Sequence, residues 1–485
     1  MKELALLLLS ILIIILAVIF YRTLRLKSRR ILVGAFQPIS IDAQAAIQHL
    51  AGAVRIQTMS HLEASQINYP AFLELHRYLS ESFPLVHQVL KREIVNQYSL
   101  LYTWQGQDAS LKPALLMGHL DVVPVEEGTE QSWVYPPFGG QVQDGYLWGR
   151  GTLDDKNAVV GILEAVDGLL RQGYQPRRTL FLAFGHDEEI GGIQGAAQIA
   201  ALLHSRGVAL ECVLDEGLAI IDGILPGVVK PFALVGIAEK GYLSVELSVE
   251  SSGGHSAMPP KETAIGILSR AMVRLEEHQM PARFQPPASQ MFAFLAPEMP
   301  FTLRLGMANL WLFEGLLLRR MQASNTTNAS IRTTTAPTIF MAGFKDNILP
   351  VQARGAVNFR LLQGDTIESV LAHLRKTIAD PRVQIKPAAN FSVEPSPVSP
   401  VDTAAFQALE RALANTFPEV AVAPGLVTGA TDSRHFASLA ASTYRFAPLW
   451  IKPDDLSRVH GTNERIGVEQ FSKMVQFYAA FIREL

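Results

Sequence analysis

The segment MGHLDVVP (117–124) ends an apolar run with two residues that could do chemistry, His119 and Asp121. In an extended segment, residues two positions apart point to the same side. The aspartate can then accept a hydrogen bond from a metal-binding histidine and fix its tautomer. The alternative is an ordinary histidine at a strand end, capped by its neighbour. Because the pattern H-x-D is common, this pair alone favours the alternative.

The segment GRGTLDDK (149–156) combines glycines, which let a backbone approach a ligand closely, with the adjacent carboxylates Asp154 and Asp155. These two acids are equally typical of the start of a helix, as an N-cap and a first-turn residue. One of them could serve each role.

The segment GHDEEIGG (185–192) places Asp187, Glu188 and Glu189 directly after the apolar run LFLAF. Apolar neighbours raise the pKa of a carboxyl group unless a cation compensates. Two adjacent glutamates can divide the work, one binding metal and the other acting as general base toward water. The competing interpretation is a solvated helix start.

Two further segments carry the same kind of side chain. LDEG ends an apolar run in Asp215 and Glu216, and VHGTNERIG supplies a late histidine, His460. Each signal is weak alone. Together with the earlier acids and His119 they form a nitrogen and oxygen ligand set that suits zinc. A carboxylate that bridges two ions about 3.5–4 Å apart would make a two-metal hydrolytic site.

The elements that must position these residues alternate between strands and helices. The runs 113–119, 179–189 and 210–217 are typical of buried strands, and 156–173 and 192–207 have helical spacing. This alternation predicts an α/β domain with a mostly parallel sheet covered on both faces. Ligands bind beyond the carboxyl ends of such strands, where the polar clusters fall.

The pattern changes near residue 237. The run 242–250 alternates like a half-exposed strand, and 263–278 is an amphipathic helix. We therefore predict a small α+β domain, 237–362, inserted between two parts of the catalytic domain, 41–236 and 363–485.

Composition limits the class of protein. A chain of 485 residues is too long for one ordinary core, so two domains are expected. The net charge of −3 and the lack of a basic stripe argue against a nucleic-acid partner. Cys212 is the single cysteine, which excludes an internal disulfide and a thiolate zinc cage.

The stretch 4–21 is apolar except for Ser10, and roughly 20 such residues cross a bilayer as a helix. A cleaved signal peptide is the alternative, but no small-x-small cleavage site follows. Five basic residues follow instead: Arg22, Arg25, Lys27, Arg29 and Arg30. We predict a single-pass membrane anchor whose basic flank keeps the body on the cytoplasmic side.

The order and wording of the motifs resemble the dinuclear-zinc metallopeptidase family that includes carboxypeptidase S, the aminoacylases and succinyl-diaminopimelate desuccinylase. The resemblance runs from about residue 45 to the C-terminus. It rests on GHLDVVPV, WGRGTLDDK, GHDEEIGG, LDEG, GGHSAMPP, GATDSR and VHGTNERI, in that order. GHDEEIGG and HGTNERI look closest to the branch of carboxypeptidase S and the N-acyl-amino-acid hydrolases.

The resemblance implies two zinc ions and a role for each residue of the set. One group would bind metal: His119, Asp154 as the bridge, Glu189, His460, and either Asp215 or Glu216. Glu188 would be the general base and proton shuttle, and Asp121 would orient His119.

The inserted domain would be the family's lid, which often also forms a homodimer. His255 in GGHSAMPP matches a lid histidine that stabilises the tetrahedral oxyanion, often from the partner subunit. Asn347 in DNILP and Arg434 in GATDSR match positions that hold the substrate. An arginine there can grip an α-carboxylate with two hydrogen bonds.

One stretch departs from the pattern, because 291–321 is very apolar for a small exposed domain. It fits a buried helix pair or a dimer interface, or else a fatty-acyl groove or a membrane contact near the anchor.

The expected activity is hydrolysis of N-acyl amino acids or small peptides with a free carboxylate. A dipeptide-type carboxypeptidase and a catalytically silent, membrane-tethered binding protein are the alternatives.

Overall fold

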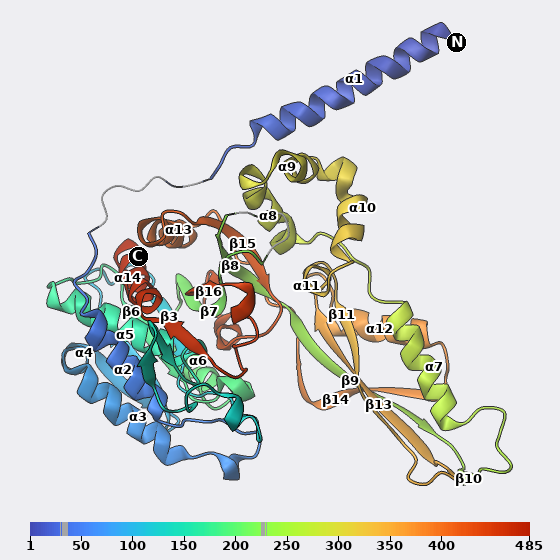
Figure 1. Cartoon of the computed structure of the whole chain (residues 1–485), viewed down its shortest axis with the longest axis horizontal. Coiled ribbons are helices and arrows are strands. Elements are labelled where there is room, and N and C mark those ends of the chain that lie inside the picture. The colour runs from blue at the N-terminus through green and yellow to red at the C-terminus, as the bar shows by residue number, and fades with distance from the viewer. Residues whose placement is uncertain (30, 32–36, 225–227, 229) are drawn as a thin grey trace.

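The computed structural model describes residues 1–29, 31, 37–224, 228 and 230–485. Arg30 and residues 32–36 of the connection after the apolar helix lie outside this range. Figure 1 shows a catalytic domain, a second domain beside it, and helix α1 (Lys2–Arg25) projecting away from both.

Within the described residues, the catalytic domain is built on an eight-stranded sheet. In spatial order its strands are β1 (Lys91–Val95), β2 (Ser99–Trp104), β6 (Leu180–Gly185), β3 (Ala114–His119), β7 (Cys212–Ile221), β16 (Thr443–Ile451), β8 (Phe232–Glu239) and β15 (Ala421–Val427). The central strands β6, β3, β7 and β16 are mutually parallel. The predicted α/β class and mostly parallel sheet are confirmed.

Helices cover both faces of this sheet. One face carries α2 (Ala43–Arg55), α5 (Lys156–Arg171), α13 (Ala404–Thr416) and α14 (Val468–Glu484), with α3 (Tyr69–Ser82) and α4 (Pro84–Val89) outside them. The other face carries α6 (Ala196–Ser205). Gly173 and Gly207 follow α5 and α6 with φ of 71° and 68°, the left-handed conformation in which glycine commonly ends a helix.

The inserted domain, here called the lid domain (241–277 and 334–393), has its own sheet and core. Its strands, in order, are β11 (Thr334–Ala342), β13 (Gln352–Leu361), β9 (Gly241–Glu250) and β14 (Val383–Val393). Helices α7 (Ala264–Glu277) and α12 (Ile367–Ile378) pack against it. At its outer end β10 (Gly254–His255) pairs with β12 (Ile348–Leu349) (Figure 1).

The lid domain therefore extends past the boundary predicted at residue 362. Strand β14 pairs with β9, and α12 buries Val370 and Leu374 in the lid core. The chain returns to the catalytic domain only afterwards, where the Ser396 and Ser399 amides donate to carbonyls of β8. The prediction failed because an amphipathic helix does not reveal which sheet it covers.

The apolar stretch divides between two environments. Helix α8 (Pro286–Leu295) packs on β15, and its Phe294 and Leu295 join the catalytic core. Helices α9 (Phe301–Ala308) and α10 (Leu310–Met321) are different. Helix α9 has no buried residue, and Met321 is the one buried residue of α10. The expected burial therefore holds for helix α8 but not for helices α9 and α10. The short helix α11 (Asn325–Ala329) leads back to the lid.

Candidate metal centre

Polar residues from five chain segments meet beyond the carboxyl ends of the central strands. His119 ends β3, Glu188 and Glu189 follow β6, and Glu216 lies in β7. The pairing of β7 with β16 shifts register between Asp215 and Leu218, and this irregularity takes Glu216 out of the regular ladder. Such bulges re-aim a side chain, here toward the His119 ring.

A small sheet brings together the two remaining loops. Strand β5 (Tyr146–Trp148) pairs with β4 (Gln141–Gln143) and with β17 (Arg465–Gly467). The loop after β5 carries Asp154, and the loop before β17 carries His460. Residues 306 positions apart in sequence thereby become neighbours.

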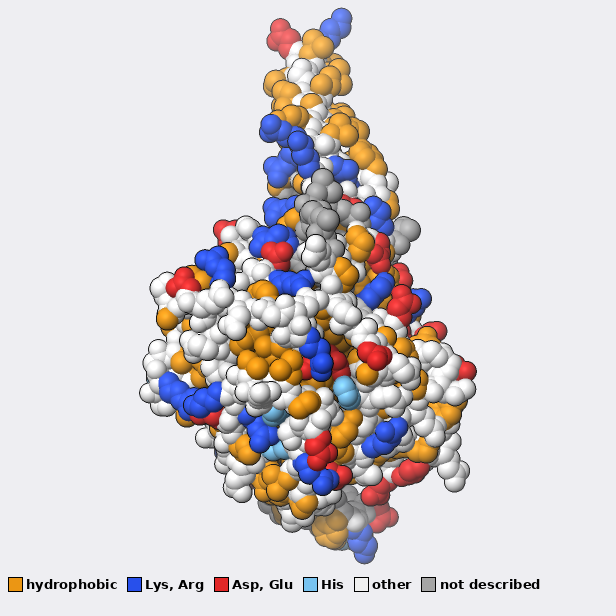
Figure 2. Space-filling model, turned by 90° about the vertical axis from the view of Figure 1, so that its left-hand side faces the viewer, with side chains coloured by type: hydrophobic (Ala, Val, Ile, Leu, Met, Phe, Trp, Pro, Cys, Tyr) orange, Lys and Arg blue, Asp and Glu red, His pale blue; other side chains and the backbone are white. Residues whose placement is uncertain are grey.

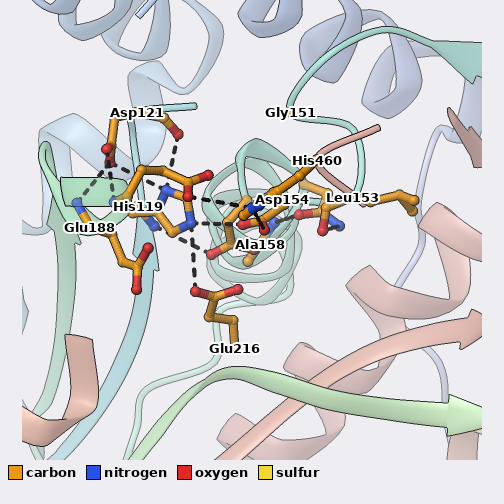
Figure 3. A network of polar contacts seen from close by, with 12 residues as sticks. His119, Asp121, Gly151, Leu153, Asp154, Ala158, Glu188, Glu216 and His460 are labelled. Atoms are coloured by element: carbon orange, nitrogen blue, oxygen red, sulfur yellow. Dashed lines mark hydrogen bonds and ion pairs between the residues drawn. The ribbon is translucent and has the colours of Figure 1, made fainter. Parts of the chain in front are cut away.

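The Asp154 carboxylate lies between two imidazole rings (Figure 3). Its Oδ1 is 2.9 Å from Nε2 of His119, and its Oδ2 is 2.9 Å from Nε2 of His460. Each ring has a second carboxylate nearby. Glu216 Oε1 is 3.6 Å from His119 Nε2, and Glu189 Oε2 is 3.4 Å from His460 Nε2.

These side chains form two groups that could each hold a metal ion, His119 with Asp154 and Glu216, and Asp154 with Glu189 and His460. Asp154 belongs to both, as a bridging ligand must. Within the described residues, Oε1 of Glu189 is buried with no hydrogen-bond partner. A buried carboxylate oxygen without a donor is costly unless a cation meets it.

Asp121 orients both halves of the site. His119 Nδ1 lies 3.0 Å from the Asp121 carbonyl oxygen and 3.3 Å from its carboxylate. Nδ1 therefore faces Asp121 and Nε2 faces Asp154, so that a neutral His119 ring would offer Nε2 to a metal ion. The same carboxylate accepts the backbone amides of Glu188 (3.1 Å) and Glu189 (3.2 Å). Asp121 thus also aims the two glutamates.

The adjacent acids divide their roles. Asp155 is the N-cap residue of α5, yet its carboxylate accepts the His119 amide instead of a helix amide. Asp215 accepts the amides of Ser433 and Glu216, which makes it a buried structural acceptor. Asp154 and Glu216 are the members of these pairs that face the histidines.

The cluster holds more acid than its two histidines can neutralise. Burial raises the pKa of Glu188 well above its ordinary value, and the neighbouring carboxylates of Asp432 and Glu189 add to this rise. Burial likewise raises the pKa of Glu216. Hydrogen bonds with Asp154 and Glu189 raise the pKa of His460 to about 10. The pKa values of all three groups would return toward their ordinary values beside a divalent cation.

An ion pair that the sequence did not reveal links the two loops of the site. The Glu464 carboxylate is fully buried and accepts Arg150 Nη1 at 2.5 Å and the amides of Gly151 and Leu153 at 3.0 and 2.6 Å. Arg150 also donates to the carbonyl of His460. The pair therefore joins the Asp154 loop to the His460 loop. Both residues lie in quoted motifs, but nothing local pairs them.

Asp432 is a third residue that sequence reasoning missed, after Arg150 and Glu464. Both of its carboxylate oxygens are buried and, within the described residues, without a hydrogen-bond partner. The side chain lies against Gly192, where an added Cβ would come 1.8 Å from Asp432 Oδ1. Arg434, two residues on, donates to the Gly191 carbonyl at 2.7 Å. The turn after Glu189 thus packs against the loop that carries Arg434.

The lid residues lie elsewhere. His255 and Asn347 sit at the outer end of the lid domain, where the Ser256 amide donates to the Asn347 carbonyl. Figure 1 shows β10 far from β3 and β7. The structure therefore brings these two residues to each other but not to the carboxylate cluster.

Histidine nitrogens and carboxylate oxygens around a shared acid, with a glutamate beside them, suit a hydrolytic metal site. Figure 3 shows the Glu188 carboxylate on the same side of the His119 ring as that of Glu216. The fold and site define a metallohydrolase with an inserted domain.

Comparison with known sequences gives the family. The chain belongs to peptidase family M20/M25/M40, whose profile matches residues 115–484. It is 45% identical to the N-fatty-acyl-amino acid synthase/hydrolase PM20D1 of Xenopus tropicalis, over 91% of this chain and 86% of that protein. It is 32% identical to carboxypeptidase S of Saccharomyces cerevisiae, over 90% and 84%.

Solved structures share the fold at low identity. The M20 family metallo-carboxypeptidase Sso-CP2 of Sulfolobus solfataricus superposes with a TM-score of 0.64 and 18% identity. The match covers 90% of this chain and 98% of that one. The family profile and the relatives of 32–45% identity make the chain an enzyme of the amide-cleaving metallohydrolase class.

The contact between Gly192 and Asp432 predicts a local steric effect on activity. Gly192→Ala should displace the turn after Glu189 and lower kcat/KM by roughly 100-fold, because small misplacements of reacting groups are costly. Gly207→Ala is the matched control, since Gly207 has a similar φ and open space around it. It should cost about 1–2 kcal/mol of stability and spare activity. Equal activity in the two variants would contradict the prediction.

The pair of Arg150 and Glu464 predicts a large stability effect. Glu464→Gln should lower the free energy of unfolding, measured in urea, by about 3 kcal/mol, because it leaves Arg150 buried without its carboxylate. Glu484→Gln, which breaks a half-exposed pair with Arg411, should cost less than about 1 kcal/mol. The interpretation fails if the two losses are alike.

Proposed function

We propose that this chain hydrolyses the amide bond of N-acyl amino acids, with two zinc ions in the carboxylate cluster. The proposed ligands are His119, Asp154, Glu189, Glu216 and His460. One observation carries the proposal: a single carboxylate, Asp154, lies 2.9 Å from two histidines that each have a second carboxylate nearby. Glu216 is preferred to Asp215, whose oxygens already accept backbone amides.

The chemistry divides between the ions and the chain. Bound zinc ions would acidify water and polarise the amide carbonyl. Glu188 would take the proton of the attacking water and deliver it to the leaving amine. Asp121 supports this role, because its carboxylate accepts the Glu188 amide and also lies 3.3 Å from the His119 ring.

Substrate selection is proposed to rest on Arg434 and on the lid. The Arg434 loop packs beside the turn that carries Glu188 and Glu189, where a guanidinium can bind the substrate carboxylate. His255 would stabilise the oxyanion and Asn347 would contact substrate. Both lie at the lid's outer end, so a partner subunit is proposed to supply them. The exposed apolar edge strand β11, with Ile339, Phe340 and Met341, supports homodimerisation through the lid.

A dipeptide-type carboxypeptidase is the second candidate. It is favoured by the similarity to carboxypeptidase S, which is more distant than that to the N-fatty-acyl-amino acid synthase/hydrolase. Because one transition state serves both directions, the site that cleaves an acyl amino acid would also catalyse its formation at high reactant concentrations.

We also propose that α1 anchors the protein in a membrane. Among the described residues, α1 is the one continuous helix long and apolar enough to cross a bilayer, and 6% of its most apolar stretch is buried. Signal sequences share these properties. Figure 2 shows hydrophobic side chains along the projecting column and Lys and Arg side chains near its base. This charge bias favours a cytoplasmic body, which a reporter fused to the C-terminus would test.

The first prediction of this proposal concerns Glu188. Full-length protein loaded with zinc should release free amine from N-acyl amino acids, and Glu188→Gln should lower kcat by about 10²–10⁴-fold, the usual worth of a general base. Glu74→Gln, on the exposed surface of α3, is the matched control and should be fully active. A panel of N-acetyl and long-chain acyl amino acids beside dipeptides decides the substrate class. Release from dipeptides alone would favour the carboxypeptidase.

The second concerns metal content, measured by elemental analysis after dialysis against dilute zinc. Glu216→Gln should reduce bound zinc from two ions per chain to about one, because one ion loses a charged ligand. Asp215→Asn should keep both ions but lower the free energy of unfolding by about 1–3 kcal/mol, since it places an NH₂ group against backbone amides. The reverse pattern would make Asp215 the ligand.

A further inference from the structure

Helices α9 and α10 form a bent apolar unit, here called the elbow (301–321). Together they are as apolar as a membrane span, but their axes are bent by 114° at Asn309, so they do not cross a bilayer as one rod. Large apolar side chains of the elbow face outward. Phe301, Trp311, Leu312 and Leu316 are 47%, 53%, 48% and 66% exposed. Soluble protein surfaces rarely gather such residues without a partner.

The corner of the elbow is joined to the C-terminal turns of α1. Asn309 is completely buried, and its Nδ2 lies 3.3 Å from the Ile19 carbonyl, 3.2 Å from Thr23 Oγ1 and 2.9 Å from the Leu305 carbonyl. The Asn309 side chain thus ties the backbone of α1 to that of α9. A buried side-chain amide that is hydrogen-bonded to both helices favours one arrangement of α1 and α9.

Contacts on either side extend this joint. The rings of Phe20 and Phe301 stack with their centroids 6.1 Å apart. Arg22 donates to the Ala308 carbonyl at 3.3 Å, and Arg304 donates to the Leu26 carbonyl. Figure 1 shows the C-terminal end of α1 above α9, while the rest of α1 extends away from the protein.

This placement says what covers the elbow. The part of α1 before Ile19 is apolar and exposed, and its length suits a bilayer. The elbow lies where α1 leaves that bilayer, beside the basic residues Arg22 and Arg25. Lysine and arginine there attract anionic headgroups, and a tryptophan such as Trp311 favours the membrane interface. Apolar surface, interfacial tryptophan and basic flank therefore coincide.

We propose that the elbow inserts into the interfacial layer of the same bilayer that α1 enters, as a second membrane attachment. The inference rests on the proposed anchoring by α1 and adds a fixed orientation to it. One anchor lets the catalytic domain swivel, whereas two attachments joined at Asn309 hold one side of α8 and β15 toward the lipid. Burial of the elbow by lipid would follow the physics of interfacial amphipathic helices.

The test uses full-length protein in vesicles of phosphatidylcholine with a minor fraction of phosphatidylglycerol. Leu316→Cys is labelled with an environment-sensitive fluorophore, and the native Cys212 does not interfere because it is 1% exposed. Leu73→Cys, exposed on α3, is the matched control, and Leu8→Cys reports on α1 itself. Lipids with a nitroxide on the acyl chain are then compared with plain lipids.

Quenching of at least half of the signal at position 316, with less than a tenth at position 73, is the expected result. Quenching at position 8 but not at 316 would overturn the elbow and leave the anchor intact. No quenching at position 8 or position 316 would overturn both the α1 anchor and the insertion of the elbow. The amide-hydrolase proposal is tested separately by its own assay. Energy transfer between position-316 labels on different chains, without lipid quenching, would mean that a second copy covers the elbow and would equally overturn the proposal.

Tryptophan fluorescence of the wild-type protein tests the same proposal without a label, so its result does not depend on the folding of a cysteine variant. The other tryptophans, Trp104, Trp133, Trp148 and Trp450, are buried or half-buried in the catalytic domain. Nitroxide lipids should therefore quench wild-type tryptophan fluorescence through Trp311, and Trp311→Phe should remove most of that quenching. Equal quenching in the two proteins would contradict insertion of the elbow.

Discussion

Carboxylates buried together repel one another and lose their hydration, so a cluster of them is stable only where positive charge lies between them. Around Asp154 the chain supplies two histidines for four carboxylates, including Glu188, Glu189 and Glu216. The remaining charge calls for a cation. Three local features of the catalytic domain serve this arrangement. The end of β3 delivers an imidazole, the irregular pairing of β7 delivers one acid, and the turn after β6 delivers two.

Two further carboxylates keep that arrangement in register, and neither faces the histidine Nε2 atoms. Asp121 collects the His119 ring and the amides of both glutamates, and Glu464 collects Arg150 and the amides around Asp154. Each fixes a backbone turn by accepting its amides. The centre therefore depends on acids of two kinds, those that face the histidines and those that fix the turns carrying them.

Sequence reasoning reached the sheet and the cluster for the same reason. Buried parallel strands are continuous apolar runs, and polar residues at their ends are conspicuous, as at His119 and Glu188. Pairings between distant segments left no such trace. Arg150 and Glu464 are 314 residues apart, and the choice between Asp215 and Glu216 depends on an irregular pairing with β16. The extent of the lid was missed because α12 is amphipathic wherever it packs.

The path of the chain between domains has a mechanical consequence. Within the described residues it passes between catalytic domain and lid at Lys240, at 278–285, at 330–333 and at 394–396. Four short connections restrict rotation of the lid relative to the catalytic domain more than two would, because every rotation must change the backbone of all four. The four connections therefore restrict changes in the separation between the lid's outer end and the cluster within one chain. If His255 acts as proposed, a lid held in this way favours a neighbouring chain, rather than bending of one chain, as its source.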